Sequence, residues 1–194
     1  MYNIEKGYSH REKVTHHDDR GFTDGWQQAV YEKALAICND LKYNKIIDVG
    51  CGSGYKLVNM FGDKDITGLE LEPALSFLKE KYPNHKWLES NFSKVPKGRF
   101  DMLICSDVIE HIDNPDNLLN FINKINCKTI VLSTPSRECY EDKYMNGPPR
   151  NPCHFREWTV DELNEYLSQS FGILEHYVNS FKGQHCQIVV MEKY

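Results

Sequence analysis

The sequence predicts an α/β fold with a seven-stranded, mostly parallel sheet and helices on both of its faces. From about Lys45 to the end of the chain, short apolar runs alternate with longer segments that have helical periodicity. A glycine-rich segment follows the first apolar run directly, as in sheets that bind ligands at the carboxyl ends of their strands. Strand–helix alternation of this kind buries a parallel sheet between two helix layers.

Seven apolar runs are the predicted strands, and each is bounded by polar or turn-forming residues. They span residues 45–49, 65–69, 85–88, 100–105, 129–133, 173–178 and 187–191. Because ligands bind outside the carboxyl ends of parallel strands, the loops after the first, second, fourth and fifth runs are expected to form one binding rim.

Helices are predicted between these runs, over 55–61, 73–82 and 116–125. Pro73 suits a first helical turn, where its missing N–H costs nothing. Thr159 and Glu162 form a capping-box pattern that opens a further helix extending to about Ser170. In residues 26–41, Trp26 and later apolar residues recur at roughly helical spacing, so a helix is predicted there. We expect this helix to lie over the rim as a lid.

Length and composition favour one domain. The chain has 194 residues and a formal net charge of −5, so we expect a single domain over 1–194, with an N-terminal lid segment at 1–42 and a core at 43–194. No apolar run approaches the ~18 residues that span a bilayer, and the polar start is not a signal peptide. The seven cysteines are odd in number and never form C-x-x-C. We therefore expect reduced thiols and a cytoplasmic protein with no membrane partner.

The glycine-rich segment, Asp48-Val-Gly-Cys-Gly-Ser-Gly54, predicts a binding loop. Glycines let the backbone approach a ligand closely, and a helix start favours an anionic group. The dinucleotide pattern G-x-G-x-x-G fails, because Tyr55 stands at the third glycine position. Glu70, 20 residues beyond Gly50, is placed to accept both hydroxyls of a ribose. The site therefore suits a nucleoside that carries a carboxylate or a similar anion.

Residues 47–54, Glu70 and the segment 100–111 together resemble the class I S-adenosylmethionine-dependent methyltransferases. The resemblance implies a Rossmann-like fold, S-adenosyl-L-methionine as cofactor and S-adenosyl-L-homocysteine as product. In that family the glycine loop holds the methionine part, the acidic residue holds the ribose, and residues after the third strand contact the adenine. The cofactor-binding residues implied here are Asp48, Gly50, Cys51, Gly52, Gly54, Glu70, Leu71, Asn91, Phe92, Ser106 and Asp107.

Two histidines are candidate catalytic residues. A hydroxyl acceptor benefits from a general base, and histidine is the usual base near neutral pH. His111 ends the fourth-strand motif, and His154 lies in the long loop 136–158. Each also has a structural interpretation: His111 as a packing residue against the following turn, His154 as a residue that staples its loop. His16 and His17 beside two aspartates are expected to be a solvated segment rather than a metal site.

A metal-dependent alternative involves Asp107, Glu110, His111 and His154. Carboxylates with imidazoles suit Mn²⁺ or Mg²⁺. The set is similar to the metal-binding residues of the small-RNA 3′-terminal 2′-O-methyltransferases, which have Glu where this chain has Asp107. The shorter side chain weakens that similarity.

The segments 146–159 and 23–27 resemble bacterial methyltransferases associated with polysaccharide and natural-product assembly. This resemblance implies O-methylation of a sugar or another small hydroxyl-bearing acceptor, and a small-molecule or glycan substrate. The acidic net charge is consistent with it, because RNA binding depends largely on Lys and Arg contacts with phosphates, so nucleic acid is not the expected partner. The chain is expected to be a monomer or homodimer. A catalytically silent, cofactor-binding partner subunit is the third interpretation.

Overall fold

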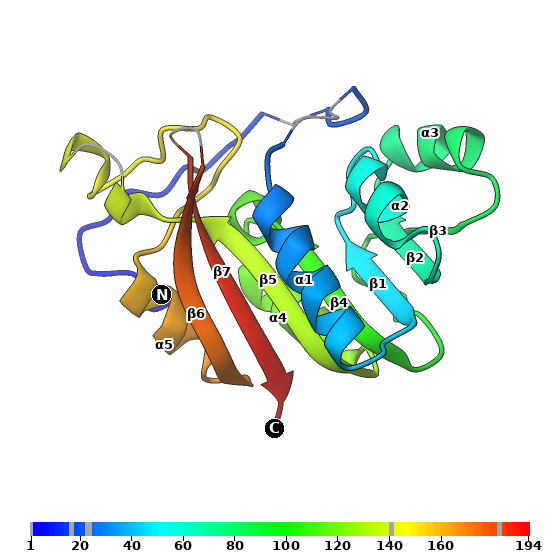
Figure 1. The fold of residues 1–194 in the computed structure, drawn as a ribbon. Helices are drawn as coiled ribbons and strands as arrows, with labels where there is room; N and C mark the ends of the chain where they lie inside the picture. The colour runs from blue at the N-terminus through cyan, green and yellow to red at the C-terminus, as the bar shows by residue number, and fades with distance from the viewer. Residues whose placement is uncertain (1, 16–17, 22–24, 140–141, 182–183) are drawn as a thin grey trace.

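A single seven-stranded sheet organises the protein, and helices cover both of its faces (Figure 1). The computed structural model describes residues 2–15, 18–21, 25–139, 142–181 and 184–194. The strand order is β3-β2-β1-β4-β5-β7-β6, in which β7 runs antiparallel to its neighbours β5 and β6 and the other pairs are parallel. The strands are β1 Lys45–Val49, β2 Asp65–Glu70, β3 Lys86–Glu89, β4 Phe100–Ser106, β5 Cys127–Pro135, β6 Phe171–Phe181 and β7 Gln184–Lys193. The predicted sheet is confirmed.

The chain forms two hydrophobic cores because neighbouring residues of each strand face opposite sides of the sheet. Ile46 packs in the core under α1, α2 and α3, whereas Ile47 packs in the core under α4 and α5. The five α-helices are α1 Gln28–Asp40, α2 Tyr55–Phe61, α3 Ala74–Lys81, α4 Pro115–Lys124 and α5 Val160–Leu167, and the short 3₁₀ helices are η1 Ile109–His111, η2 Arg137–Cys139 and η3 Asp142–Tyr144. None of the helices in the described residues is long and apolar enough to cross a membrane.

Local signals place the helix ends well. The capping box at the start of α5 is present in both directions: Thr159 Oγ1 accepts from the Glu162 N–H at 3.2 Å, and the Glu162 carboxylate accepts from the Thr159 N–H at 2.9 Å. The predicted end at about Ser170 is too late, because β6 begins at Phe171 and the helix ends at Leu167.

The expected helical lid over the rim is wrong. Helix α1 packs along the sheet face beside α2, over β4 and β5 (Figure 1). Its buried face is Val30, Tyr31, Ala34 and Cys38 rather than the stripe that begins at Trp26, which is 57% exposed. The apolar side of α1 favours packing on the sheet face, because a helix placed over the rim as a lid would leave that side exposed to water.

The segment that does cross the rim is non-helical. Residues 2–15 run beside the long loop between β5 and α5: the Ser9 N–H donates to the Asn146 carbonyl and the Arg11 N–H to the Phe155 carbonyl, both at 2.8 Å. Figure 1 shows this blue segment rising past the β6–β7 end and crossing above the carboxyl ends of the strands. The N-terminal residues therefore hold the loop that carries His154.

Candidate active site

The glycine loop between β1 and α2 lies at the switch point of the sheet, because β1 is flanked by β2 on one side and β4 on the other. Gly50, Gly52 and Gly54 have φ values of +77°, +55° and +69°. A Cβ atom on Gly50 would lie 2.4 Å from Val108 Cγ2. Glycine is required there by both its backbone conformation and the close approach of the β4 end.

Glu70, at the end of β2, is bonded to this loop. Its carboxylate accepts from the Gly52 N–H and from the Leu71 N–H, each at 2.8 Å. The side chain of Leu71 is 44% exposed beside it. The acidic residue and the glycine loop thus form one hydrogen-bonded unit, and ribose binding by Glu70 stays a prediction.

Asp48 at the end of β1 is fully buried and has an unpaired oxygen. Its Oδ2 accepts from the Tyr31 hydroxyl of α1 at 2.8 Å, while Oδ1 has no hydrogen-bond partner among the described residues. Burial raises the pKa of Asp48 to about 7, and the Tyr31 hydrogen bond opposes the rise. A buried carboxylate with a spare oxygen under the glycine loop fits a cationic group such as an ammonium. Nothing in the sequence near Tyr31 signals this contact.

Cys51 and Asp19 complete the surroundings of the loop. The Cys51 side chain is buried behind the loop, and burial raises its pKa well above the ordinary value of a thiol. From the other side, Asp19 Cβ lies 3.2 Å from the position a Cβ on Gly52 would take. The crossing N-terminal segment therefore touches the loop, a contact that the sequence did not predict.

The residues predicted to contact adenine follow β3 but are held by their own loop. Asn91 Oδ1 accepts from Ser93 Oγ at 2.6 Å and from the Ser93 N–H at 3.1 Å. Phe92, with φ +56°, packs its ring 5.3 Å from that of Phe121. An adenine contact by either side chain stays a prediction.

The end of β4 is fixed by β5. Ser106 is buried and shares a hydrogen bond of 3.0 Å with Ser133 Oγ. Asp107 has the left-handed φ of +51°, and its Oδ1 accepts from Ser133 Oγ at 2.7 Å and from the Cys186 thiol at 3.5 Å. Left-handed backbone at a non-glycine residue is uncommon and concentrates at functional sites.

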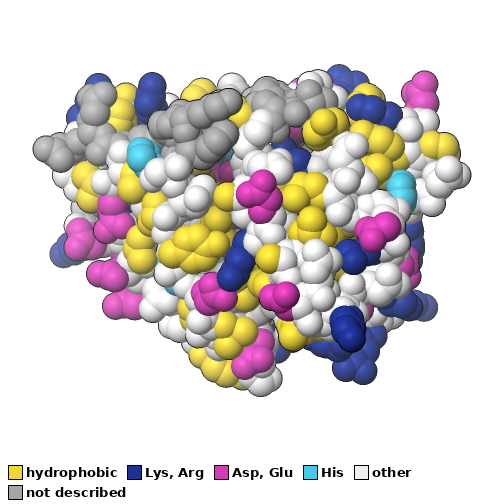
Figure 2. Space-filling view, in the orientation of Figure 1, with side chains coloured by type: hydrophobic (Ala, Val, Ile, Leu, Met, Phe, Trp, Pro, Cys, Tyr) yellow, Lys and Arg dark blue, Asp and Glu magenta, His cyan; other side chains and the backbone are white. Residues whose placement is uncertain are grey.

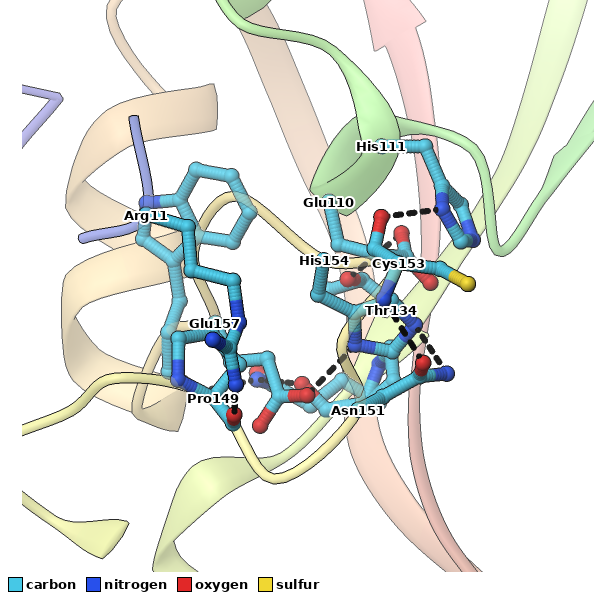
Figure 3. Close-up of polar contacts among 12 residues, drawn as sticks. Arg11, Glu110, His111, Thr134, Pro149, Asn151, Cys153, His154 and Glu157 are labelled. Atoms are coloured by element: carbon cyan, nitrogen blue, oxygen red, sulfur yellow. Dashed lines mark hydrogen bonds and ion pairs between the residues drawn. The ribbon is translucent and has the colours of Figure 1, made fainter. Parts of the chain in front are cut away.

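A second cluster lies next along the rim and combines Glu110, His111 and His154 (Figure 3). One carboxylate oxygen and one ring nitrogen from each histidine lie within 4.8 Å of one another. Val108, which contacts Gly50, precedes Glu110 by two residues, so the cluster adjoins the glycine loop. The structure brings both candidate catalytic histidines together, with ring centroids 4.7 Å apart.

Glu110 is fully buried in the cluster, where His154 is also buried and His111 is partly exposed. Its Oε2 accepts from Thr134 Oγ1 at 2.9 Å, and its Oε1 has no partner among the described residues. Burial, and then the nearby Asp107 carboxylate, raise the pKa of Glu110 well above its usual range. A spare carboxylate oxygen beside two imidazoles fits a divalent cation or a histidine that gains a proton.

Three of the four residues in the metal hypothesis lie in this cluster. Asp107, the fourth, is instead bonded to Ser133 and Cys186. Helix η1, which follows β4 after two residues, carries Glu110 and His111, and the Asp107 carboxylate lies near enough to Glu110 to raise its pKa. His16, His17 and the residues 23–24 of the second resemblance lie outside the described residues.

The two structural interpretations are partly right. The ring of His154 bonds to Asn151 and Glu157 within its own loop, at 2.9 Å and 2.5 Å, so it does staple the loop while it lies beside His111. His111 Nδ1 bonds to the Cys153 carbonyl of the same loop, at 2.8 Å.

Arg156 is a basic residue of this loop whose guanidinium is turned inward. It is buried and donates to the carbonyls of Ile112 and Asp113, at 2.9 Å and 2.7 Å. Asn151 and Glu157 are the polar residues of this loop that the sequence analysis missed. Their only signal is the spacing of three residues on each side of His154.

A model of a methyltransferase domain matches residues 19–173. The chain belongs to this methyltransferase-domain family. The match covers the glycine loop, Glu70 and the cluster at the end of β4, so the expected S-adenosylmethionine-dependent methyltransferase domain is confirmed. An association with polysaccharide or natural-product assembly is not shown and stays a prediction.

Among curated proteins, a ubiquinone biosynthesis O-methyltransferase of Rickettsia bellii is 31% identical over 117 residues, which are 56% of this chain and 49% of that protein. The chain spans about half the length of the curated relatives it matches first.

Two solved structures share the fold. Magnesium protoporphyrin IX methyltransferase from Synechocystis, with bound S-adenosylhomocysteine, has a TM-score of 0.68 at 16% identity, covering 88% of this chain and 84% of that one. The methyltransferase domain of bacterial CtHen1 has a TM-score of 0.65 at 21% identity, covering 87% and 100%.

Proposed function

We propose that this protein is an S-adenosylmethionine-dependent O-methyltransferase whose acceptor is a hydroxyl group on a sugar or another small molecule. The observation that carries the proposal is the cluster of Glu110, His111 and His154 beside the glycine loop, in which Glu110 Oε1 has no hydrogen-bond partner within the described part of the chain. An oxygen acceptor needs a proton acceptor nearby, and this cluster offers two imidazoles with a carboxylate behind them. The Rickettsia relative, named as an O-methyltransferase, agrees with that class of acceptor.

The cofactor side is carried by the loop and its neighbours. When bound, S-adenosylmethionine supplies an electrophilic methyl group on a sulfonium, and the protein's main task is placement. Glu70 would accept hydrogen bonds from the ribose in place of the two backbone N–H groups that it now receives. Asp48 would face the positive end of the methionine part through its spare oxygen. Neither role requires a change in the sheet.

On the acceptor side, a histidine of the cluster would accept the hydroxyl proton. The bound cofactor would supply the methyl group to the acceptor oxygen and leave as S-adenosylhomocysteine with the electron pair of the broken carbon–sulfur bond. The buried Glu110 has a carboxylate oxygen within 4.8 Å of one ring nitrogen of each histidine, and in its ionised form it would stabilise the imidazolium.

A second candidate, a metal-dependent methyltransferase that acts on the 3′-terminal 2′-hydroxyl of RNA, is favoured by the donor set itself. Glu110, His111 and His154 would hold Mn²⁺ or Mg²⁺, which would polarise the acceptor hydroxyl. The net charge of −5 weighs against RNA. Figure 2 agrees for the face that it shows, where acidic and basic side chains are interspersed.

The test is methyl transfer from labelled S-adenosylmethionine to total RNA or to a fraction of sugars, glycans and small metabolites, with and without Mn²⁺. Metal-independent label in the small-molecule fraction is the expected result. Label in RNA that requires Mn²⁺ would replace the first candidate with the second. No label in either fraction, with S-adenosylhomocysteine still bound, would instead support a silent partner subunit and refute both.

A further inference from the structure

The loop between η3 and α5 holds both histidines of the cluster by hydrogen bonds, at both ring nitrogens of His154 and at Nδ1 of His111 (Figure 3). His154 Nδ1 lies 2.5 Å from Glu157 Oε1, and His154 Nε2 lies 2.9 Å from Asn151 Nδ2. His111 Nδ1 lies 2.8 Å from the Cys153 carbonyl oxygen. All the partners come from residues 151–157.

The orientation of the Asn151 amide is fixed independently of His154. The Cys153 N–H donates to Asn151 Oδ1 at 2.9 Å, so the oxygen of the amide faces the backbone and its NH₂ group faces the histidine. An NH₂ group only donates. His154 Nε2 must therefore accept, which leaves the proton on Nδ1, from which it is donated to Glu157.

The same reasoning applies to His111. A carbonyl oxygen only accepts, so His111 Nδ1 carries a proton and donates to Cys153. Two rings, 4.7 Å apart and nearly perpendicular at 86°, are thus both held by one loop with a proton on Nδ1.

We infer that Asn151 and Glu157 are positioning residues that fix His154 as the Nδ1-protonated tautomer, so that its Nε2 lone pair is the reactive one. This inference rests on the proposed function, because a base and a metal ligand both need that lone pair. Asn151 is exposed, and its amide marks the place where the acceptor hydroxyl or the metal would approach Nε2. Glu157 is buried behind the ring and keeps its orientation.

The test reads the tautomer directly, without substrate. Long-range ¹H–¹⁵N correlation spectra of the uniformly labelled protein separate a protonated ring nitrogen from one with a lone pair, and the His154 signals are those lost in His154→Gln. We expect a proton on Nδ1 and a lone pair on Nε2. Asn151→Ala and Glu157→Ala should each keep this pattern through the remaining partner, whereas the double variant should show a mixture of both tautomers.

Controls separate a local effect from a loss of fold. The double variant Glu32→Ala with Asn39→Ala removes the same residue types from the exposed side of α1 and should leave the His154 pattern unchanged. Affinity for S-adenosylhomocysteine should stay within twofold in all variants. A proton on His154 Nε2 in the unmodified protein, or an unchanged pattern in Asn151→Ala with Glu157→Ala, would overturn the inference. Should Glu157→Ala impair folding, the His154 tautomer of the unmodified protein decides the inference alone, because Asn151→Ala by itself is expected to keep the pattern. Because no acceptor is present, this outcome is independent of whether methyl transfer is detected.

Discussion

Replacing Asp48 by Asn should stabilise the cofactor-free protein above neutral pH and weaken its cofactor binding. Asp48 is fully buried, and its pKa rises from 3.8 to about 7, chiefly through burial. Asn keeps the shape and an oxygen that can accept from the Tyr31 hydroxyl, but it has no charge to desolvate. The substitution therefore isolates the cost of the buried carboxylate.

The sign and size follow from the two pKa values. Below pH 3.8 the carboxyl is protonated in the folded and unfolded chains alike. As pH rises from there to about 7, the unfolded chain loses the proton and the folded chain keeps it, so stability falls across that window and the full penalty is present above it. A gap of about three units corresponds to at most about 4 kcal/mol, at about 1.4 kcal/mol per unit.

Urea unfolding of both proteins at pH 4.5, 6 and 8 measures this difference, since pH effects of other groups cancel between them. The stability advantage of Asp48→Asn should grow by at least about 2 kcal/mol between pH 4.5 and pH 8. The variant Asp63→Asn, at an exposed carboxylate, should show no such growth. A pH-independent difference would refute the reasoning.

At pH 8 the same substitution should raise the dissociation constant for S-adenosylmethionine at least about tenfold, because the ammonium loses its buried partner.

Three further substitutions test the loop and the cluster. Glu70→Ala should weaken S-adenosylhomocysteine binding by at least about 1.5 kcal/mol in calorimetry; unchanged affinity would remove Glu70 from the site. Gly50→Ala should lower the free energy of unfolding by about 2 kcal/mol or more, because the position combines a positive φ with the 2.4 Å approach of Val108. The control Gly98→Ala, at a positive φ with open space around it, should lower the free energy of unfolding by less. Equal losses would mean that the contact with Val108 does not matter. His154→Ala should leave cofactor affinity intact and cut turnover about 10²-fold or more, while a loss confined to thermal stability would assign His154 to stapling its loop.

Much of the candidate site was predictable because its parts are consecutive in the chain. The loop from Asp48 to Gly54 would bind its ligand through its own backbone, and Glu70 stands at the end of the next strand. Such short-range patterns are set by strand ends and turns, which leave their mark in the sequence. The sequence only suggested that His111 and His154 lie together, because Cys153, the residue of the His154 loop that binds His111, is 42 residues further along the chain.

The sequence by itself determined the strands, the helix caps and the glycine loop, since periodicity, capping and positive φ are local properties. Only the tertiary structure decided where the N-terminal residues lie: α1 on the sheet face with Tyr31 on Asp48, and the segment 2–15 against the loop of His154. The tertiary structure also places the Asp107 carboxylate against the Ser133 hydroxyl and the Glu110 carboxylate beside the two histidines. These outcomes depend on which apolar faces and buried polar atoms meet in three dimensions, and no spacing along the chain encodes that choice.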